Sequence, residues 1–143
     1  MTSPAQVIIA AIEMSGWDTA QETGYPLFPG PEILDEPDQA VFITVSGGTG
    51  YVTEEAAADS WTFQARLRGP QNEPDAALNA AAQLDALILW MASQRFAPYG
   101  TAILTAGRTG GPPAQLPLDP EDRRFQTTCN YMAVTGSAIY QGA

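Results

Sequence analysis

The chain has 143 residues, the length of one domain, with sixteen acidic residues, six arginines, no lysine and no histidine, for a net charge of -10. Without histidine, neither a Ser-His-Asp nor a Cys-His catalytic pairing can form, and the single cysteine, Cys129, excludes an internal disulfide and a thiolate metal site. The negative charge opposes binding to a phosphate backbone by charge neutralisation, and no apolar run approaches the about 20 residues that cross a bilayer.

The N-terminal residues predict a helix that begins after Ser3 and ends near Gly16. Ser3 is a favourable N-cap, and a proline at position 4 suits the first turn. Apolar side chains recur at helical spacing at Val7, Ile8, Ala11 and Ile12. Residues 17–38 then predict a long irregular connection, rich in proline, glycine and acidic residues. We expect three aromatic residues to anchor it: Trp17, Tyr25 and Phe28.

Two segments in the middle of the chain predict antiparallel strands. Residues 39–46 are mostly apolar, and residues 60–69 alternate between apolar and polar side chains. In the second segment one face carries Trp61, Phe63, Ala65 and Leu67, and the other carries Thr62, Gln64, Arg66 and Arg68. One apolar and one polar face is typical of an antiparallel sheet.

A long helix is predicted to follow, with Asn72 as its N-cap and its end near Arg95. Its apolar side carries Ala77, Ala81, Leu84, Leu87, Ile88 and Met91. Residues 101–106 and 123–140 predict two further strands, separated by a long loop at 107–122. The sequence therefore predicts an α+β fold in the order α-β-β-α-β-β, with four mainly antiparallel strands, an N-terminal helix and one long helix packed on the sheet.

The glycine-rich stretch between the first two strands, SGGTGYVTEEAAADS, has two interpretations. A phosphate-binding loop would need a Lys-Ser/Thr after its last glycine, whereas Gly50 is followed by Tyr51. Glu54 and Glu55 would also lie where phosphate should bind. We therefore prefer a long hairpin connection in which the glycines supply positive φ and an acidic arm reaches a neighbouring subunit.

Other candidate sites favour structural interpretations. Cys129 has no histidine to activate it, and we expect it to be a small core residue. The spacing of Asp119, Glu121 and Asp122 does not match a calcium-binding loop, so turn chemistry and local ion pairs are expected there. Arg66 and Arg68 are expected to meet acidic groups of the same or a neighbouring chain. No catalytic residue, metal site or cofactor is predicted.

The order of these elements resembles the tail terminator (tail completion) proteins of long-tailed, non-contractile bacteriophages. The resemblance covers most of the chain: the N-terminal helix, the strand VFITVSGG, the arginine-bearing strand FQARLRG at 63–69 and the helix DAALNAAAQLDALIL. A Gly/Pro-rich loop then leads to a similar ending, carried by Asp119, Arg123 or Arg124, Asn130, Tyr131 and Val134.

The resemblance implies a structural virion protein rather than an enzyme. In proteins of this kind the subunits form a ring, commonly a hexamer, at the head-proximal end of the tail tube. The resemblance implies that the ring stops growth of the tube and docks on the head connector protein. DNA passes through the lumen without specific binding, no membrane is involved, and assembly takes place in the host cytoplasm before the ring joins the head–tail junction of the virion.

Two alternatives to this function stay open. One is a head–tail connector or neck protein of similar size, and the other is a small ligand-binding domain or enzyme that uses the 46–55 loop. Under the ring interpretation, the residues expected at subunit or partner interfaces are Gly47, Gly48, Gly50, Tyr51, Glu54, Glu55, Arg66, Arg68, Arg108, Arg123 and Arg124.

Overall fold

The computed structural model describes residues 3–17, 24–35, 39–52, 57–94, 97–118 and 120–137. Within this part of the chain there are two α-helices, α1 (Pro4–Met14) and α2 (Pro74–Trp90), and two short 3₁₀ helices, η1 (Met91–Gln94) and η2 (Pro98–Gly100). The strands are β1 (Leu27–Pro29), β2 (Ala40–Val52), β3 (Ala57–Gln71), β4 (Thr101–Arg108), β5 (Ala114–Gln115) and β6 (Arg124–Ser137).

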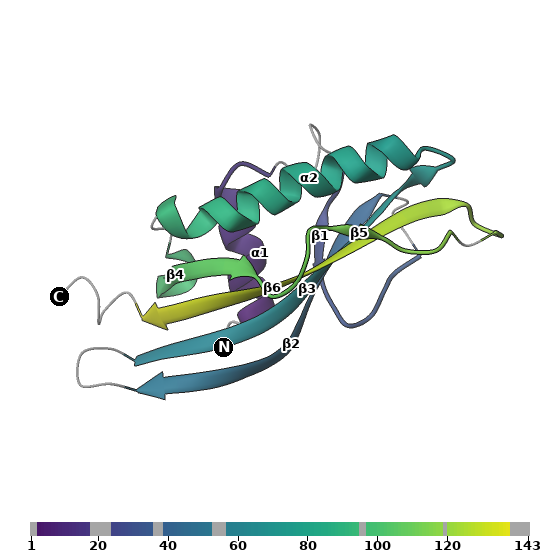
Figure 1. The fold of residues 1–143 in the computed structure, drawn as a ribbon. Helices are drawn as coiled ribbons and strands as arrows, with labels where there is room; N and C mark the ends of the chain where they lie inside the picture. Colours follow the sequence, from purple (N-terminus) through teal and green to yellow (C-terminus); the bar gives the residue numbers. More distant parts are fainter. Residues whose placement is uncertain are drawn as a thin grey trace.

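All six strands belong to one sheet, in the order β1-β2-β3-β6-β4, and β5 pairs with β6 as well. The pairing is antiparallel except between β1 and β2, which run parallel. Figure 1 shows α2 lying along the sheet, with the long strands β2, β3 and β6 running side by side beneath it.

The mixed α+β class and both predicted helices are confirmed, but the prediction of four strands is wrong, since the sheet has six. The two additional strands are only three and two residues long. Both lie inside segments that are rich in proline, where no alternation of apolar and polar residues is long enough to indicate a strand. Their pairing comes from the neighbouring long strands rather than from their own sequence.

The glycine-rich stretch is part of the hairpin itself rather than a connection. β2 continues through it to Val52, and its backbone pairs with β3 as far as Val52 with Ala57. Gly47 and Gly48 have no positive φ, so the expected role for glycine is wrong at these two positions. Gly48 instead leaves room for the indole of Trp61, because an added Cβ would lie 2.5 Å from its Cε3 atom.

The hydrophobic core lies between one face of the sheet and both α-helices. Ser3 caps α1 together with Gln6 in a reciprocal capping box, as its position predicted. The predicted apolar side of α1 is buried in full, and that of α2 is buried except for Leu87, which is partly buried. α2 approaches β3 closely, because a Cβ on Gly69 would lie 2.8 Å from the Cβ of Ala77.

The start of α2 differs from the prediction. Glu73 is its N-cap and makes no side-chain capping hydrogen bond. Asn72 has a positive φ of 61°, and its side chain accepts a hydrogen bond from Nε of Arg123. This asparagine therefore ties the turn after β3 to the start of β6 instead of capping the helix.

The segment Pro74–Gln94 is long and apolar enough to cross a membrane, by length and composition alone. Its apolar side packs on the sheet and supplies core residues such as Leu84 and Ile88. The helix also carries a buried carboxylate, Asp85. The apolar composition of this segment is therefore explained by its packing in the hydrophobic core.

The two adjacent glycines of β2 provide a matched test of this hairpin packing. We expect Gly48→Ala to lower the free energy of unfolding by about 2 kcal/mol, because the new methyl group collides with the Trp61 indole. Gly47→Ala should leave stability unchanged or raise it by up to about 0.5 kcal/mol, since its nearest neighbour would be Oγ1 of Thr62 at 3.6 Å. Urea unfolding of both variants measures the difference, and equal losses would contradict the packing.

Candidate functional site

The sheet has two free edges, which lie across from one another on either side of the same part of the sheet. They are the strongest candidate for an interaction site. β1 covers β2 only at Val41–Ile43, so within the described chain residues 44–52 have no strand on their outer side. We call these residues the β2 edge. At the opposite side of the sheet, β6 is the one described strand that pairs with β4, and the outer side of β4, residues 101–108, is the β4 edge.

The register of the sheet places these edges opposite one another. The hairpin residues Ala58 to Gln64 pair with residues 136 to 130 of β6. β4 pairs with the same part of β6, from Ser137 to Tyr131. The short strands β1 and β5 occupy the other half of the sheet, where β5 pairs with Thr127 and Thr128. One half of the sheet is thus closed by short strands and the other half is open on both sides.

Each free edge carries one irregularity. The β2 register shifts between Val45 and Gly47, and the β4 register shifts between Ile103 and Thr105. Such bulges bend a strand and increase its twist. The exposed side chain of Leu104 lies at the second bulge.

The predicted interface glycines lie on the β2 edge, with Gly47 and Gly48 exposed there. The backbones of Gly50 and Tyr51 pair with Asp59 and Ala58. Glu54 and Glu55 lie outside the described residues. The glycine part of the prediction and the β2 edge therefore coincide, although the side chain of Tyr51 is not among those described.

Arg66 and Arg68 lie on the sheet face that carries no helix. Nε of Arg66 donates to Oε1 of Gln126 at 2.7 Å. Arg68 is only 4% exposed and donates from Nη1 to the carbonyl oxygen of Leu34 at 2.7 Å. Its guanidinium also lies over the ring of Phe42, 5.5 Å from the centroid. Arg68 thus holds the 33–35 segment against the sheet through the backbone oxygens of Leu34 and Asp35.

Arg108 lies on the opposite face, in a polar cluster between α2 and the sheet. Its guanidinium forms a two-pronged ion pair with the carboxylate of Asp85. The hydroxyl of Tyr131 donates to Oδ1 of the same carboxylate at 2.9 Å. Asp85 is 6% exposed, so these donors satisfy a charge that would otherwise be buried alone. The cluster ties α2 to both β4 and β6.

The ionisation of this cluster follows from its contacts. Burial opposes ionisation of Asp85, but the hydrogen bonds from Arg108 and Tyr131 outweigh it, so the pKa of Asp85 lies below its ordinary value. Burial raises the pKa of Tyr131 well above its ordinary value. Burial also raises the pKa of the Cys129 thiol, which donates to the carbonyl oxygen of Gly111 at 3.6 Å. Cys129 is the buried core residue that the sequence predicted and is poorly suited to act as a thiolate nucleophile.

Arg123 and Arg124 lie at the end of the sheet where β6 begins, away from both free edges. Arg123 donates to Asn72, and the backbone N–H of Arg124 donates to Oδ1 of Asp122 at 3.0 Å. The bond to Asp122 agrees with the turn chemistry expected there, and Asp119 lies outside the described residues. Among the residues described, no group of three or more histidine, cysteine or acidic side chains could hold a metal ion.

The structure therefore does not gather the predicted arginines into one surface. They divide between the open face, the helix side and the start of β6. Two acidic residues, Asp85 and Asp59, were not among the predicted site residues. Asp85 had a signal, because it falls on the apolar side of α2, next to Leu84, where a carboxylate requires a partner.

The Asp85 cluster predicts a specific pH dependence. Because the folded-state pKa of Asp85 is lowered, its ionised form stabilises the fold above the unfolded pKa of about 3.9, and this contribution is lost as the pH falls through the folded value. We expect Asp85→Asn to lower the free energy of unfolding by about 2 kcal/mol at pH 7. The loss should shrink as the pH falls below about 3.9, because the ionised form then contributes less to stability.

The exposed Asp75→Asn, in the first turn of the same helix, is the matched control. It should cost about 0.5 kcal/mol, from the helix dipole alone. Urea titrations at pH 7 and near pH 3 provide both values. Equal losses in the two variants, or an Asp85→Asn loss that does not change with pH, would contradict the role given to the cluster.

Comparison with known proteins gives no function for the site described above. No model of a protein family matches the chain, and no curated protein matches it. The free edges and the side chains around them are therefore the basis for a proposed function.

Proposed function

We propose that this chain forms a homo-oligomeric ring through its sheet edges, and that the ring caps the head-proximal end of a bacteriophage tail tube. The observation that supports the ring is the pair of free edges on opposite sides of one half of the sheet. A free edge presents backbone N–H and C=O groups that another strand can pair with. The β2 edge has nine residues and the β4 edge has eight, which is ample for strand pairing.

The strand directions support pairing between the two edges. Each step from β2 to β3, β6 and β4 is antiparallel, so β2 and β4 run in opposite directions. If a rotation brings the β2 edge of one subunit beside the β4 edge of the next, the new pair is antiparallel as well. The sheet then continues across the interface without a change in its pattern.

This contact joins two different surfaces, so it repeats from subunit to subunit. A repeated contact of this kind generates a ring when the rotation closes and an open filament when it does not. The bulges near Ser46 and Leu104 support closure, because they bend the two strands that would form the interface.

The placement of the ring rests on the resemblance to tail terminators. It assigns the tail tube protein and the head connector protein as partners, a hexamer as the common ring size, and the head–tail junction as the location. A neck protein of similar size would use the same edges, and the partner that it binds separates the two. The alternative of a ligand-binding domain or enzyme placed its site at 46–55, where residues 46–52 are strand and residues 53–55 lie outside the described residues.

Leu104→Lys tests the edge-to-edge contact. A charged side chain at the bulge of the β4 edge should oppose strand pairing and weaken self-association, or binding to tube ends, by at least about tenfold. Leu78→Lys is the matched control, because Leu78 lies on α2 and both leucines are 39% exposed. Light scattering and negative-stain imaging, of the protein alone and mixed with the tail-tube protein, measure the effect.

The wild-type protein should form rings, or should cap tubes and limit their length. If Leu104→Lys behaves like Leu78→Lys, the edge contact is wrong. If the wild-type protein neither self-associates nor binds or limits tubes, the terminator function is wrong.

A further inference from the structure

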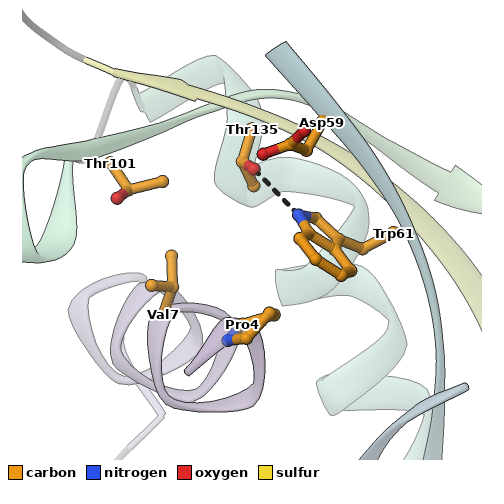
Figure 2. A pocket seen from close by; sticks show the side chains of 6 residues that line it. All are labelled: Pro4, Val7, Asp59, Trp61, Thr101 and Thr135. Carbon is orange, nitrogen blue, oxygen red and sulfur yellow. Dashed lines mark hydrogen bonds between the residues drawn. The ribbon is translucent and has the colours of Figure 1, made fainter. Parts of the chain in front are cut away.

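A small hollow lies on the helix side of the sheet, where the first turn of α1 meets the start of β4. It is lined by Pro4, Val7, Asp59, Trp61, Thr101 and Thr135, with a volume of about 150 Å³. Figure 2 shows the Asp59 and Thr135 side chains on its sheet side and Pro4 and Val7 on its helix side. No residue of this hollow belongs to the Asp85 cluster.

The polar lining favours a cation. Asp59 is exposed and is the only charged residue among the described residues that line the hollow. A carboxylate binds a guanidinium through two parallel hydrogen bonds, and an indole face attracts a cation. The indole of Trp61 is held in place, since its Nε1 donates to Oγ1 of Thr135 at 3.1 Å. Gly48 on β2 gives the same ring the space that it occupies.

The helix terminus beside the hollow offers little to an anion. Pro4 has no N–H group, and the N–H of Gln6 bonds to Oγ of Ser3. The N–H of Val7 bonds to the carbonyl oxygen of Ser3. Most donors of this helix end are therefore already used, and the part of the chain that the structure describes places no arginine in the lining.

The remaining lining suits an apolar stem. Pro4 and Val7 form an apolar wall along which methylene groups can lie while the charged head reaches the carboxylate. A volume of about 150 Å³ admits one side chain, whereas pockets for drug-sized ligands start at about 300 Å³. From this combination of carboxylate, indole ring and apolar wall, we propose that the hollow binds an alkylguanidinium group.

Such a group can come from an arginine side chain of a second copy of this chain or from a free small molecule. The inference does not rest on the proposed ring, because a single subunit contains every lining residue. A protein that fails to cap tubes can still bind the guanidinium, and the reverse also holds.

The test is a titration of the wild-type protein with butylguanidinium, followed by the indole N–H signals in ¹H–¹⁵N spectra. The chain has three tryptophans, and Trp61→Phe identifies the signal of Trp61. We expect a saturable shift of that signal with a dissociation constant in the millimolar range. Asp59→Asn should weaken binding about threefold to fivefold, as for an exposed ion pair.

Two controls make the result specific. Butylurea has nearly the same shape without the charge and should not produce a saturable shift. Glu13→Gln removes one carboxylate from the exposed far end of α1, roughly 13 Å along the helix from Pro4, and should bind like wild type. The proposal is overturned if the Trp61 signal does not saturate, if butylurea acts equally, or if Asp59→Asn binds like Glu13→Gln.

A second measurement identifies the source. If the group belongs to a second copy, butylguanidinium should compete with self-association in sedimentation experiments, and Asp59→Asn should weaken that association. If butylguanidinium binds while self-association is unchanged, the source is a free small guanidinium compound.

Discussion

The pairing of β3 with β6 is the constraint on which the rest of the structure depends. It runs from Ala58 with Gly136 to Gln71 with Arg124, and it joins segments that are far apart in the sequence. The other described strands are built onto this pair: β2 pairs with the outer side of β3 and carries β1 beyond it, and β4 and β5 pair with the outer side of β6. Because β4 and β5 share one side of β6 at different levels, the sheet divides into a closed half and an open half. The free edges follow from that division.

The helices depend on the same pair of strands. Phe63 and Tyr131 are direct neighbours across it, and their rings stack with centroids 5.3 Å apart. Tyr131 also places its hydroxyl against Asp85, which fixes the level at which α2 crosses the sheet. A buried carboxylate with too few donors would be expensive, so Arg108 has to reach it from the end of β4. The position of the β4 edge therefore depends on where α2 packs on the sheet, because the ion pair between Arg108 and Asp85 joins β4 to α2.

Patterns in short stretches of sequence predicted the helices and strands that depend mainly on those stretches. The capping box at Ser3, the alternation in β3 and the apolar sides of both helices were sufficient for the two helices and the four long strands. The glycines at 47 and 48 led to the wrong prediction of a connection, because glycine usually marks a turn. Here Gly48 instead makes space for the indole of Trp61 on the next strand. That reason exists only once Trp61 is paired with Gly48. The hollow around Asp59 was equally hidden, since it combines α1, β3, β4 and β6.

The uneven covering of the sheet has a consequence for the ring that we propose. Both helices lie on one face, so a closed sheet has its thicker layer outside, where the circumference is larger, and its face without helices inside. In the described parts of β2, β3 and β6 this face carries no acidic side chain, although the chain has sixteen acids. It is formed by polar groups such as Thr62, Gln64 and Asn130, together with Arg66. The strands would therefore contribute no acidic side chain to the lumen, whereas the 33–35 segment that Arg68 holds on this face adds Asp35. DNA would pass such a lumen because too few positive charges are present to hold a phosphate backbone.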